Sequence, residues 1–260
     1  MSGEVIVVGM GPGPVKYLTE QTKEILLSTD QVYFRFSGHP VFQWMKDMGK
    51  ECLSFDFLYR QDGITYDRIY KTIDQALVKA AKKWGKAVYA LPGNPYVFEL
   101  TPKWLKPLCE KEGVKLTIVP GMSFLEELYV DLEVDPESGL QILNACAFSY
   151  YGDYPFTEKL GLLIGQVGLP WAMSPREKRD NVQALTDCLL KKFPPEHQVT
   201  LIWSSGMPDY NNKQVTMALS DLPRQEGFTK HLATLYVPPI KPPWEWVEGS
   251  GGSKDTPVCK

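Results

Sequence analysis

The sequence contains few of the residues from which metal centres and disulfide frameworks are built. Its 260 residues include three histidines and five cysteines, and no two cysteines form a CxxC pair. An odd number of widely spaced cysteines does not make a disulfide framework, so we expect a reducing, cytoplasmic setting and no metal site. No apolar run approaches the length of a membrane-spanning helix, and the run Val5–Val8 is too short for a signal peptide.

A large excess of charge of either sign is also missing. The formal net charge is −3, and lysine and glutamate alternate in segments such as 103–112, so no basic face is indicated. We therefore expect neither nucleic acid nor a membrane as the main partner. A content of 43% hydrophobic and 23% charged residues is typical of a globular protein of one large or two small domains.

What the first half does contain is a regular alternation of short apolar segments with amphipathic ones. Buried strands are predicted at residues 5–8, 32–36, 87–91 and 116–119. Helices are predicted from Thr19 through 27, over 66–83, and from Val97 to Glu112, where Gly113 ends the helix. This alternation predicts an α/β architecture with a mainly parallel sheet.

The second half follows a different pattern. Helices are predicted at 123–132 and 178–192, and strands at 140–143, 160–164, 199–203, 214–219 and 232–237. The last strands follow one another without a long helix, which predicts antiparallel additions to a mixed sheet. We expect an N-terminal α/β domain at 1–119, a C-terminal α/β domain at 120–241 and a flexible tail at 242–260, rich in Pro, Gly, Ser and charge.

Three predicted strands of the first half end in corners rich in glycine and proline, at residues 9–14, 91–95 and 119–123. In open α/β sheets, ligands bind beyond the carboxyl ends of the strands. Glycine there lets the backbone approach a ligand closely, and proline fixes the turn. Any one corner is equally well explained as an ordinary turn. Three together predict one rigid cleft lined mostly by backbone.

The first corner matches neither common nucleotide-binding motif. A GxGxxG fingerprint requires glycine at its sixth position, where this chain has Pro14. Arg35 and Phe36 occupy the place beyond the second strand where an acidic ribose ligand is expected. These departures argue against a nicotinamide enzyme, and the missing Gly-Lys-Ser/Thr excludes a P-loop.

The three corners resemble, in order and spacing, the motifs of the tetrapyrrole methylases, the class III S-adenosylmethionine (SAM)-dependent methyltransferases. GMGPGPVKYLT at 9–19 resembles the family's opening GxGPGDPxLLT, YALPGNPYVFE at 89–99 its second motif, and VPGMSFLEE at 119–127 its third. QVG at 166–168 and LATLYVPP at 232–239 extend the similarity over nearly the whole chain.

One branch of this family is especially similar. Segments 54–59, 66–70 and 193–199 resemble the methylase-like domain that precedes MazG-type nucleotide pyrophosphohydrolases. We expect no MazG domain in the residues that follow Pro239.

The resemblance implies two α/β domains with SAM in the cleft between them, usually in a homodimer. Carried over by motif, the residues in contact with SAM are Pro12, Gly93, Asn94, Val97, Ser123, Phe124, Gln166, Val167, Ala233 and Thr234. Asn94 departs from the aspartate that the family usually has, which removes a charge near the sulfonium but keeps a hydrogen-bonding side chain.

Methyl transfer is an in-line displacement, so the protein mainly positions and desolvates the reactants and requires no metal. The catalytic residues are not specified by the sequence; the candidates are Tyr59, Tyr66 and Tyr70, in an aromatic-rich stretch suited to line an acceptor pocket. Arg60 and Arg68 are candidates to hold acidic groups of the acceptor. The alternative is that this stretch is only a half-buried loop and helix start.

Two further features are interpreted by position. His39, before Pro40, is interpreted as a turn residue rather than a catalyst, and residues 171–175 as a loop able to cover the cleft.

Three functions remain open. The first is a SAM-dependent methyltransferase that acts on a small molecule, tetrapyrrole-like or other. The second is a peptide backbone N-methyltransferase like the borosin enzymes, which carry an arginine where this chain has Tyr66 and an apolar core peptide that the tail lacks. The third is a SAM-binding regulatory protein without turnover, which Asn94 and the absence of an obvious acid or base keep open.

Overall fold

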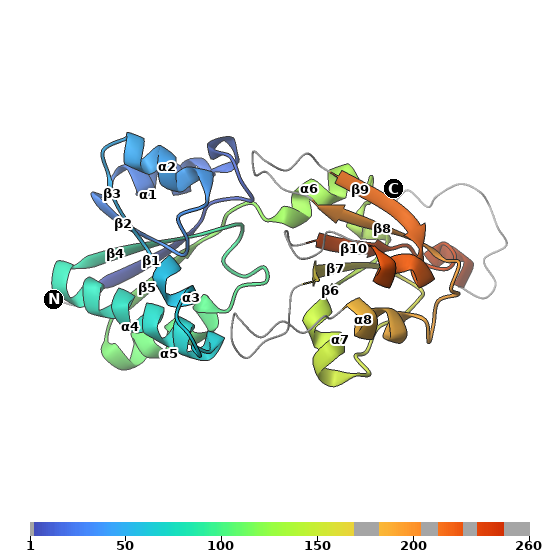
Figure 1. Ribbon diagram of the computed structural model, residues 1–260. Coiled ribbons are helices and arrows are strands. Elements are labelled where there is room, and N and C mark those ends of the chain that lie inside the picture. Colours follow the sequence, from blue (N-terminus) through green and yellow to red (C-terminus); the bar gives the residue numbers. More distant parts are fainter. Residues whose placement is uncertain (1–2, 169–181, 204–212, 226–232, 247–260) are drawn as a thin grey trace. The chain divides into compact units, whose positions relative to one another are not determined.

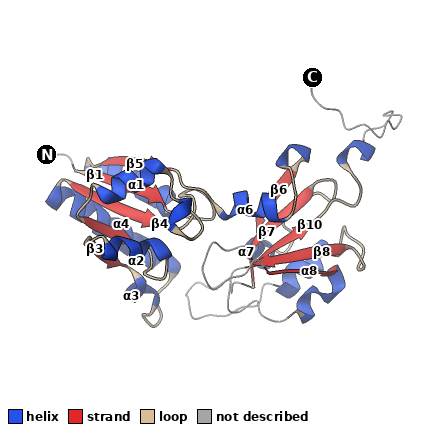
Figure 2. Cartoon of the chain, turned by 90° about the horizontal axis from the view of Figure 1, so that it is seen from above, coloured by secondary structure: helices blue, strands red, loops and turns tan. Residues whose placement is uncertain are grey.

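The computed structural model describes residues 3–168, 182–203, 213–225 and 233–246, which form two compact units (Figures 1 and 2). The first unit runs to Glu133 and the second begins at Val134. The predicted covering loop at 171–175 and the tail beyond residue 246 lie outside the described residues.

The first unit is an α/β unit built on one five-stranded sheet. Its strands are β1 (Glu4–Gly9), β2 (Gln31–Phe34), β3 (Glu51–Ser54), β4 (Lys86–Leu91) and β5 (Lys115–Val119). Its helices are the 3-10 helix η1 (Val15–Tyr17), α1 (Glu20–Leu27), α2 (Pro40–Asp47), α3 (Asp56–Tyr59), α4 (Tyr66–Trp84), α5 (Thr101–Glu112) and α6 (Phe124–Asp131).

The sheet has the strand order β3-β2-β4-β1-β5, and every pairing in it is parallel. β1 lies between β4 and β5, with Val5 opposite both Ala87 and Leu116. The predicted parallel sheet is confirmed. β3 was not predicted, because its sequence Glu-Cys-Leu-Ser has neither a continuous apolar run nor β-branched residues.

Helices cover both faces of this sheet (Figure 1). Alternate residues of each strand point to opposite faces, so Val5 and Tyr89 pack with the helix α4 side. Val88 and Phe34 pack on the other face with residues of α1 and α2. Both cores are fully buried, which leaves the two ends of the strands as the places where backbone can reach a ligand.

The long helix α4 follows from local signals. The Thr65 hydroxyl accepts a hydrogen bond from the Arg68 amide at 3.3 Å, which caps the helix start. Ile69, Ile73 and Leu77 form its buried stripe. Gly85, with φ of 80°, ends it. The predicted helix at 66–83 is therefore confirmed.

The second unit has a mixed sheet in the order β6-β7-β10-β8-β9. Its strands are β6 (Leu140–Asn144), β7 (Gly161–Val167), β8 (Gln198–Trp203), β9 (Lys213–Ala218) and β10 (Ala233–Val237). Its helices are η2 (Pro136–Ser138), α7 (Ala145–Tyr151), α8 (Val182–Leu189), η3 (Leu219–Arg224) and η4 (Pro243–Trp246).

Only the pairing of β6 with β7 is parallel among the described strands of the second unit, and the others are antiparallel. The predicted mixed sheet is therefore confirmed. Across both units, none of the described helices combines the length and the apolar character that crossing a bilayer requires.

Candidate functional site

The first two glycine corners are joined by hydrogen bonds between their backbones. The Gly93 amide donates to the Gly11 carbonyl at 2.7 Å, and the Gly11 amide donates to the Gly93 carbonyl at 3.3 Å. Both corners follow neighbouring parallel strands, β1 and β4, so their meeting is a consequence of the sheet order.

The third corner packs against the other two at backbone distance. A Cβ atom on Gly121 would lie 2.5 Å from the Gly93 oxygen and 2.6 Å from the Gly9 oxygen. A Cβ atom on Gly9 would lie 2.5 Å from the Gly93 oxygen and 2.6 Å from the Gly121 nitrogen. Glycine is required at both positions because only backbone without side chains fits there. We call the joined corners, residues 9–14, 91–97 and 119–124, the glycine rim.

Asn94 links the second corner to the third. Its Nδ2 donates to the Gly121 carbonyl at 3.0 Å, and its Oδ1 accepts from the Tyr96 amide at 2.9 Å. An aspartate has no donor to offer the Gly121 carbonyl. The departure at Asn94 therefore supplies a hydrogen bond that holds the glycine rim together.

The remaining predicted residues of the first unit lie on the same rim. Ser123 is buried and caps α6, with its amide and hydroxyl both donating to Glu126 at 2.6 Å. The Phe124 ring packs against Phe98, the residue that follows the second corner, with centroids 5.6 Å apart. Pro12 and Val97 are half-buried in the first and second corners.

His39 reaches the glycine rim from the start of α2. Its Nδ1 accepts from the Val41 amide at 3.3 Å, and its Nε2 lies 3.1 Å from the Gly11 carbonyl. Burial lowers the pKa of His39 to about 4, although its hydrogen bond to Gly11 acts in the opposite direction. The imidazole is thus neutral at pH 7 and acts as the N-cap residue of a helix, in keeping with its predicted place in a turn.

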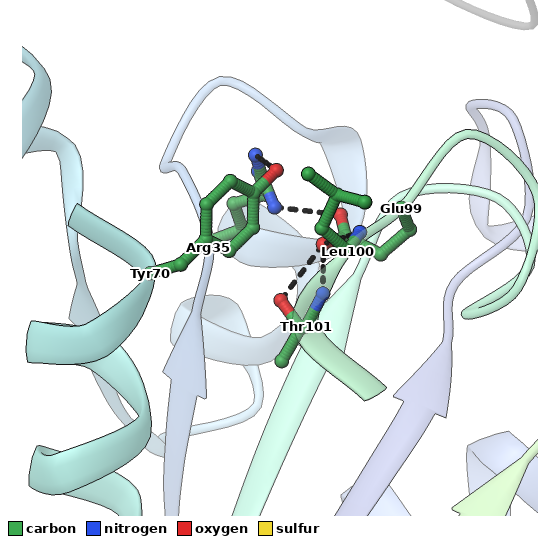
Figure 3. A network of polar contacts seen from close by, with 5 residues as sticks. All are labelled: Arg35, Tyr70, Glu99, Leu100 and Thr101. Carbon is green, nitrogen blue, oxygen red and sulfur yellow. Dashed lines mark hydrogen bonds and ion pairs between the residues drawn. The ribbon is translucent and has the colours of Figure 1, made fainter. Parts of the chain in front are cut away.

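A second polar group lies just after the end of β2 and is centred on Arg35 (Figure 3). Its Nη1 pairs with Glu99 Oε2 at 2.6 Å and its Nη2 donates to the Tyr70 hydroxyl at 2.6 Å. The guanidinium also lies over the Tyr70 ring, 4.8 Å from the centroid, and 5.7 Å from that of Tyr59. The side chains of Arg35 and Glu99 are only 16% and 9% exposed, so this is a mostly buried ion pair.

Glu99 connects the Arg35 group to the start of α5. Its Oε1 accepts from the amides of Leu100 and Thr101 and from the Thr101 hydroxyl, at 2.7 to 2.9 Å (Figure 3). These bonds satisfy the first amides of α5, which begins at Thr101. The predicted start at Val97 is wrong, because Phe98 adopts a φ of 54° that no helix accepts.

The structure brings two of the three candidate tyrosines to Arg35. Tyr59 ends α3, Tyr70 lies in α4, and both contact the guanidinium. Tyr66, at the first residue of α4, is half-buried. Arg60 and Arg68 are exposed, and the arginine that contacts the tyrosines is Arg35, which the sequence analysis did not select. A charged residue directly after a buried strand, at the edge where ligands bind, was the available signal.

Three polar atoms around this group are buried without a hydrogen-bond partner among the described residues. They are the hydroxyls of Tyr59 and Tyr89 and the Oδ1 of Asp74. Burial raises the pKa of Asp74 to about 7, and the negative charge of Glu99 adds to the effect. Burial also raises the pKa of both tyrosines, against the effect of Arg35. All three groups are therefore candidates to meet polar atoms of a ligand or of water.

The raised pKa of Asp74 predicts a stability that falls as pH rises. The folded chain keeps the proton up to about pH 7, whereas the unfolded chain loses it near the ordinary value of 3.8. Between pH 5 and 8 the D74N variant should therefore gain roughly 2–3 kcal/mol of unfolding free energy relative to the parent. Urea unfolding of both proteins at the two pH values measures this difference, and an equal pH dependence would contradict it.

In the second unit, the four predicted contact residues lie together at one end of the sheet. Val167, the last residue of β7, pairs with Ala233, the first of β10, next to a break in the register. Thr234 follows and lies opposite Ile202 of β8. Gln166 has a φ of 62°, and its Oε1 accepts from Asn144 Nδ2 at 2.7 Å. Such backbone strain in a non-glycine residue is common at ligand sites.

A family model describing the tetrapyrrole (corrin/porphyrin) methylases matches residues 4–223. The chain belongs to this family. Members of this family use SAM as their methyl donor. The chain therefore belongs to the class of SAM-dependent methyltransferases. Among the residues that the structure describes, no cluster of three or more His, Cys, Asp or Glu side chains suited to a metal occurs.

Similar proteins include a bacterial and a fungal one. YabN of Bacillus subtilis (strain 168) is 30% identical over 93% of this chain, which spans 46% of YabN. A methyltransferase/type II borosin cyclic peptide precursor of Phlebiopsis gigantea is 24% identical over 92% of the chain, which spans 43% of that protein. The chain thus covers less than half the length of these relatives.

Solved methyltransferases share the fold. Uroporphyrin-III C-methyltransferase of Thermus thermophilus superposes with a TM-score of 0.67 and 19% identity, over 92% of this chain and 94% of that one. Cobalt precorrin-4 methyltransferase superposes with a TM-score of 0.64 and 15% identity, over 90% and 94% of the two chains. Two sheets, one all-parallel and one mixed, match this fold.

Proposed function

We propose that this chain transfers a methyl group from SAM to a small-molecule acceptor, with the donor held at the glycine rim. The observation that carries the proposal is the close packing of Gly9, Gly93 and Gly121. Backbone groups that are already fixed in place can bind a donor with a charged sulfonium without rearranging. When bound, SAM would supply an electrophilic methyl group to a nucleophilic acceptor.

The chain's own residues would act by positioning. Asn94, with its two hydrogen bonds, keeps the second and third corners in register, and it places no negative charge beside the donor. Ser123 ties the third corner to the start of α6. Rigid elements that hold two reactants in line contribute much of the rate in a displacement of this kind.

We place the acceptor at Tyr59, Tyr66, Tyr70 and Arg35. The Arg35 charge is already balanced by Glu99, so this group offers mainly phenol hydroxyls to an acceptor. Burial raises the pKa of Tyr59 and of Tyr70 further above neutral, so both of these hydroxyls stay protonated at pH 7. They would therefore orient the acceptor by hydrogen bonds, and the acceptor would bring its own nucleophilic lone pair.

The acceptor is a tetrapyrrole-like or other small molecule in this proposal. Segments 54–59, 66–70 and 193–199 resemble the methylase-like domain that precedes MazG-type pyrophosphohydrolases. That branch is not tied to tetrapyrroles, so the resemblance supports a wider choice of acceptor. We further propose a homodimer, as the family resemblance implies, and a cytoplasmic location, which the odd number of widely spaced cysteines favours.

A peptide acceptor is the second candidate, and the borosin relatives favour it. Against it stands Tyr66, at the place where those enzymes carry an arginine. In this chain the guanidinium near the tyrosines comes from Arg35 in a different segment.

Calorimetry with SAM and with its demethylated product, S-adenosylhomocysteine (SAH), tests the proposal. We expect both to bind, and no binding of either at about millimolar concentration would overturn the assignment. Methyl-labelled SAM incubated with the protein and a cell extract then identifies the acceptor. Label in the small-molecule fraction supports the proposal, label in peptides supports the borosin-like alternative, and binding without any transfer indicates a regulatory protein.

A further inference from the structure

We propose that His39 is a positioning residue for the methyl donor, because it fixes the carbonyl of Gly11 and so the shape of the first corner. The inference rests on the proposed function. A residue that only capped α2 would not have this role. His39 itself takes no part in the chemical step of methyl transfer.

The carbonyl of Gly11 receives two donors. The Gly93 amide approaches it to 2.7 Å and His39 Nε2 to 3.1 Å. Gly11 itself has a φ of 77°, a conformation that glycine adopts readily and other residues rarely. Two hydrogen bonds to one carbonyl hold this flexible peptide in a single orientation. The next residue, Pro12, has its φ fixed by its ring, so the corner keeps one shape up to that point.

The hydrogen-bond partners settle which nitrogen of His39 carries the proton. The Val41 amide is a donor, so Nδ1 must be the unprotonated acceptor. Nε2 then carries the hydrogen and donates it to Gly11. The side chain is 2% exposed, and the Phe36 ring meets it edge-on with centroids 6.3 Å apart. One buried neutral side chain thus connects the start of α2 to the glycine rim.

The two nitrogens of His39 can be tested separately by amide substitutions. An asparagine side chain places its amide group near the position of Nδ1, and a glutamine side chain reaches the position of Nε2. H39N therefore keeps the acceptor for Val41 and loses the donor to Gly11. H39Q keeps the donor to Gly11 and loses the helix cap.

We expect the dissociation constant for SAH, measured by calorimetry, to rise about tenfold in H39N and to stay within about twofold of the parent in H39Q. The thermal midpoints of both variants should fall, because each loses one buried hydrogen bond. The amide exchange rate of Gly93, measured without ligand, should rise in H39N more than in H39Q. This second readout requires no binding at all.

The outcomes separate the two claims. Absence of SAH binding by the parent protein would overturn the proposed function, while the Gly93 exchange rates would still test the link from His39 to Gly11. Parent-like affinity in H39N, equal losses of affinity in both variants, or equal Gly93 exchange rates would each show that His39 only caps α2, and would overturn the positioning role.

Discussion

Replacement of Gly121 by alanine is expected to abolish SAH binding, with a loss of at least about 100-fold, and to destabilise the fold by about 1–3 kcal/mol. The added Cβ would lie within 2.6 Å of the Gly93 oxygen and of the carbonyl carbon and oxygen of Gly9. All of these are backbone atoms, so no side chain can move aside. The third corner must shift away from the other two, and the glycine rim opens.

Gly3, which directly precedes the first residue of β1, offers a matched control. A Cβ on Gly3 would lie 2.3 Å from the Ala81 carbonyl oxygen, which is also a backbone clash, but just before the amino end of β1. G3A should therefore cost a similar free energy of unfolding and leave the SAH dissociation constant within about twofold of the parent. Denaturant unfolding and calorimetry on both variants make the comparison. Normal SAH binding by G121A would contradict the account of the rim.

Replacement of Arg35 by methionine is expected to lower the free energy of unfolding by about 3–5 kcal/mol, because it leaves the Glu99 carboxylate buried without its counter-charge. Methionine fills similar volume, so the loss is mainly electrostatic. The double variant R35M/E99Q should be more stable than R35M, since it leaves no unpaired charge.

Y70F is the matched control for this pair. It removes the hydroxyl that accepts from Arg35 Nη2 and keeps the ring that stacks on the guanidinium. Its expected cost is about 1 kcal/mol. Urea unfolding of the parent, R35M, E99Q and R35M/E99Q measures the coupling between Arg35 and Glu99, and Y70F is measured beside them. A cost of R35M no larger than that of Y70F, or additive losses in R35M/E99Q, would show that the buried ion pair is not the dominant interaction.

The glycine rim could be anticipated from the sequence because its signals are local. Each corner follows a short β-branched or apolar strand, and parallel strands place their carboxyl ends at one edge of a sheet. The closeness of Gly9 and Gly121 then follows from the pairing of β1 with β5. The sequence analysis treated Asn94 as a lost charge that keeps a hydrogen-bonding side chain, and it gave that side chain no partner. Its hydrogen bond to Gly121 depends on the third corner, 27 residues away, and required the fold.

The Arg35 group could not be predicted from the same signals. Arg35 contacts Tyr70 and Glu99, which lie 35 and 64 residues away along the chain. The sequence around each of these three residues does not indicate that it contacts the other two. Sequence proximity pointed to Arg60 and Arg68, whose side chains are exposed instead. The start of α5 was misplaced because the local pattern did not show the positive φ of Phe98, after which Glu99 accepts from the amides at the helix start.

The central claim, that the glycine rim holds SAM, is tested most directly by NMR of protein labelled with ¹⁵N-glycine and titrated with SAH. The amide signals of Gly11, Gly93 and Gly121 should shift, whereas those of Gly85 and Gly113, which precede β4 and β5 at the opposite edge of the sheet, should not. Unchanged signals from the rim in the presence of bound SAH, or shifts confined to glycines elsewhere, would contradict the account.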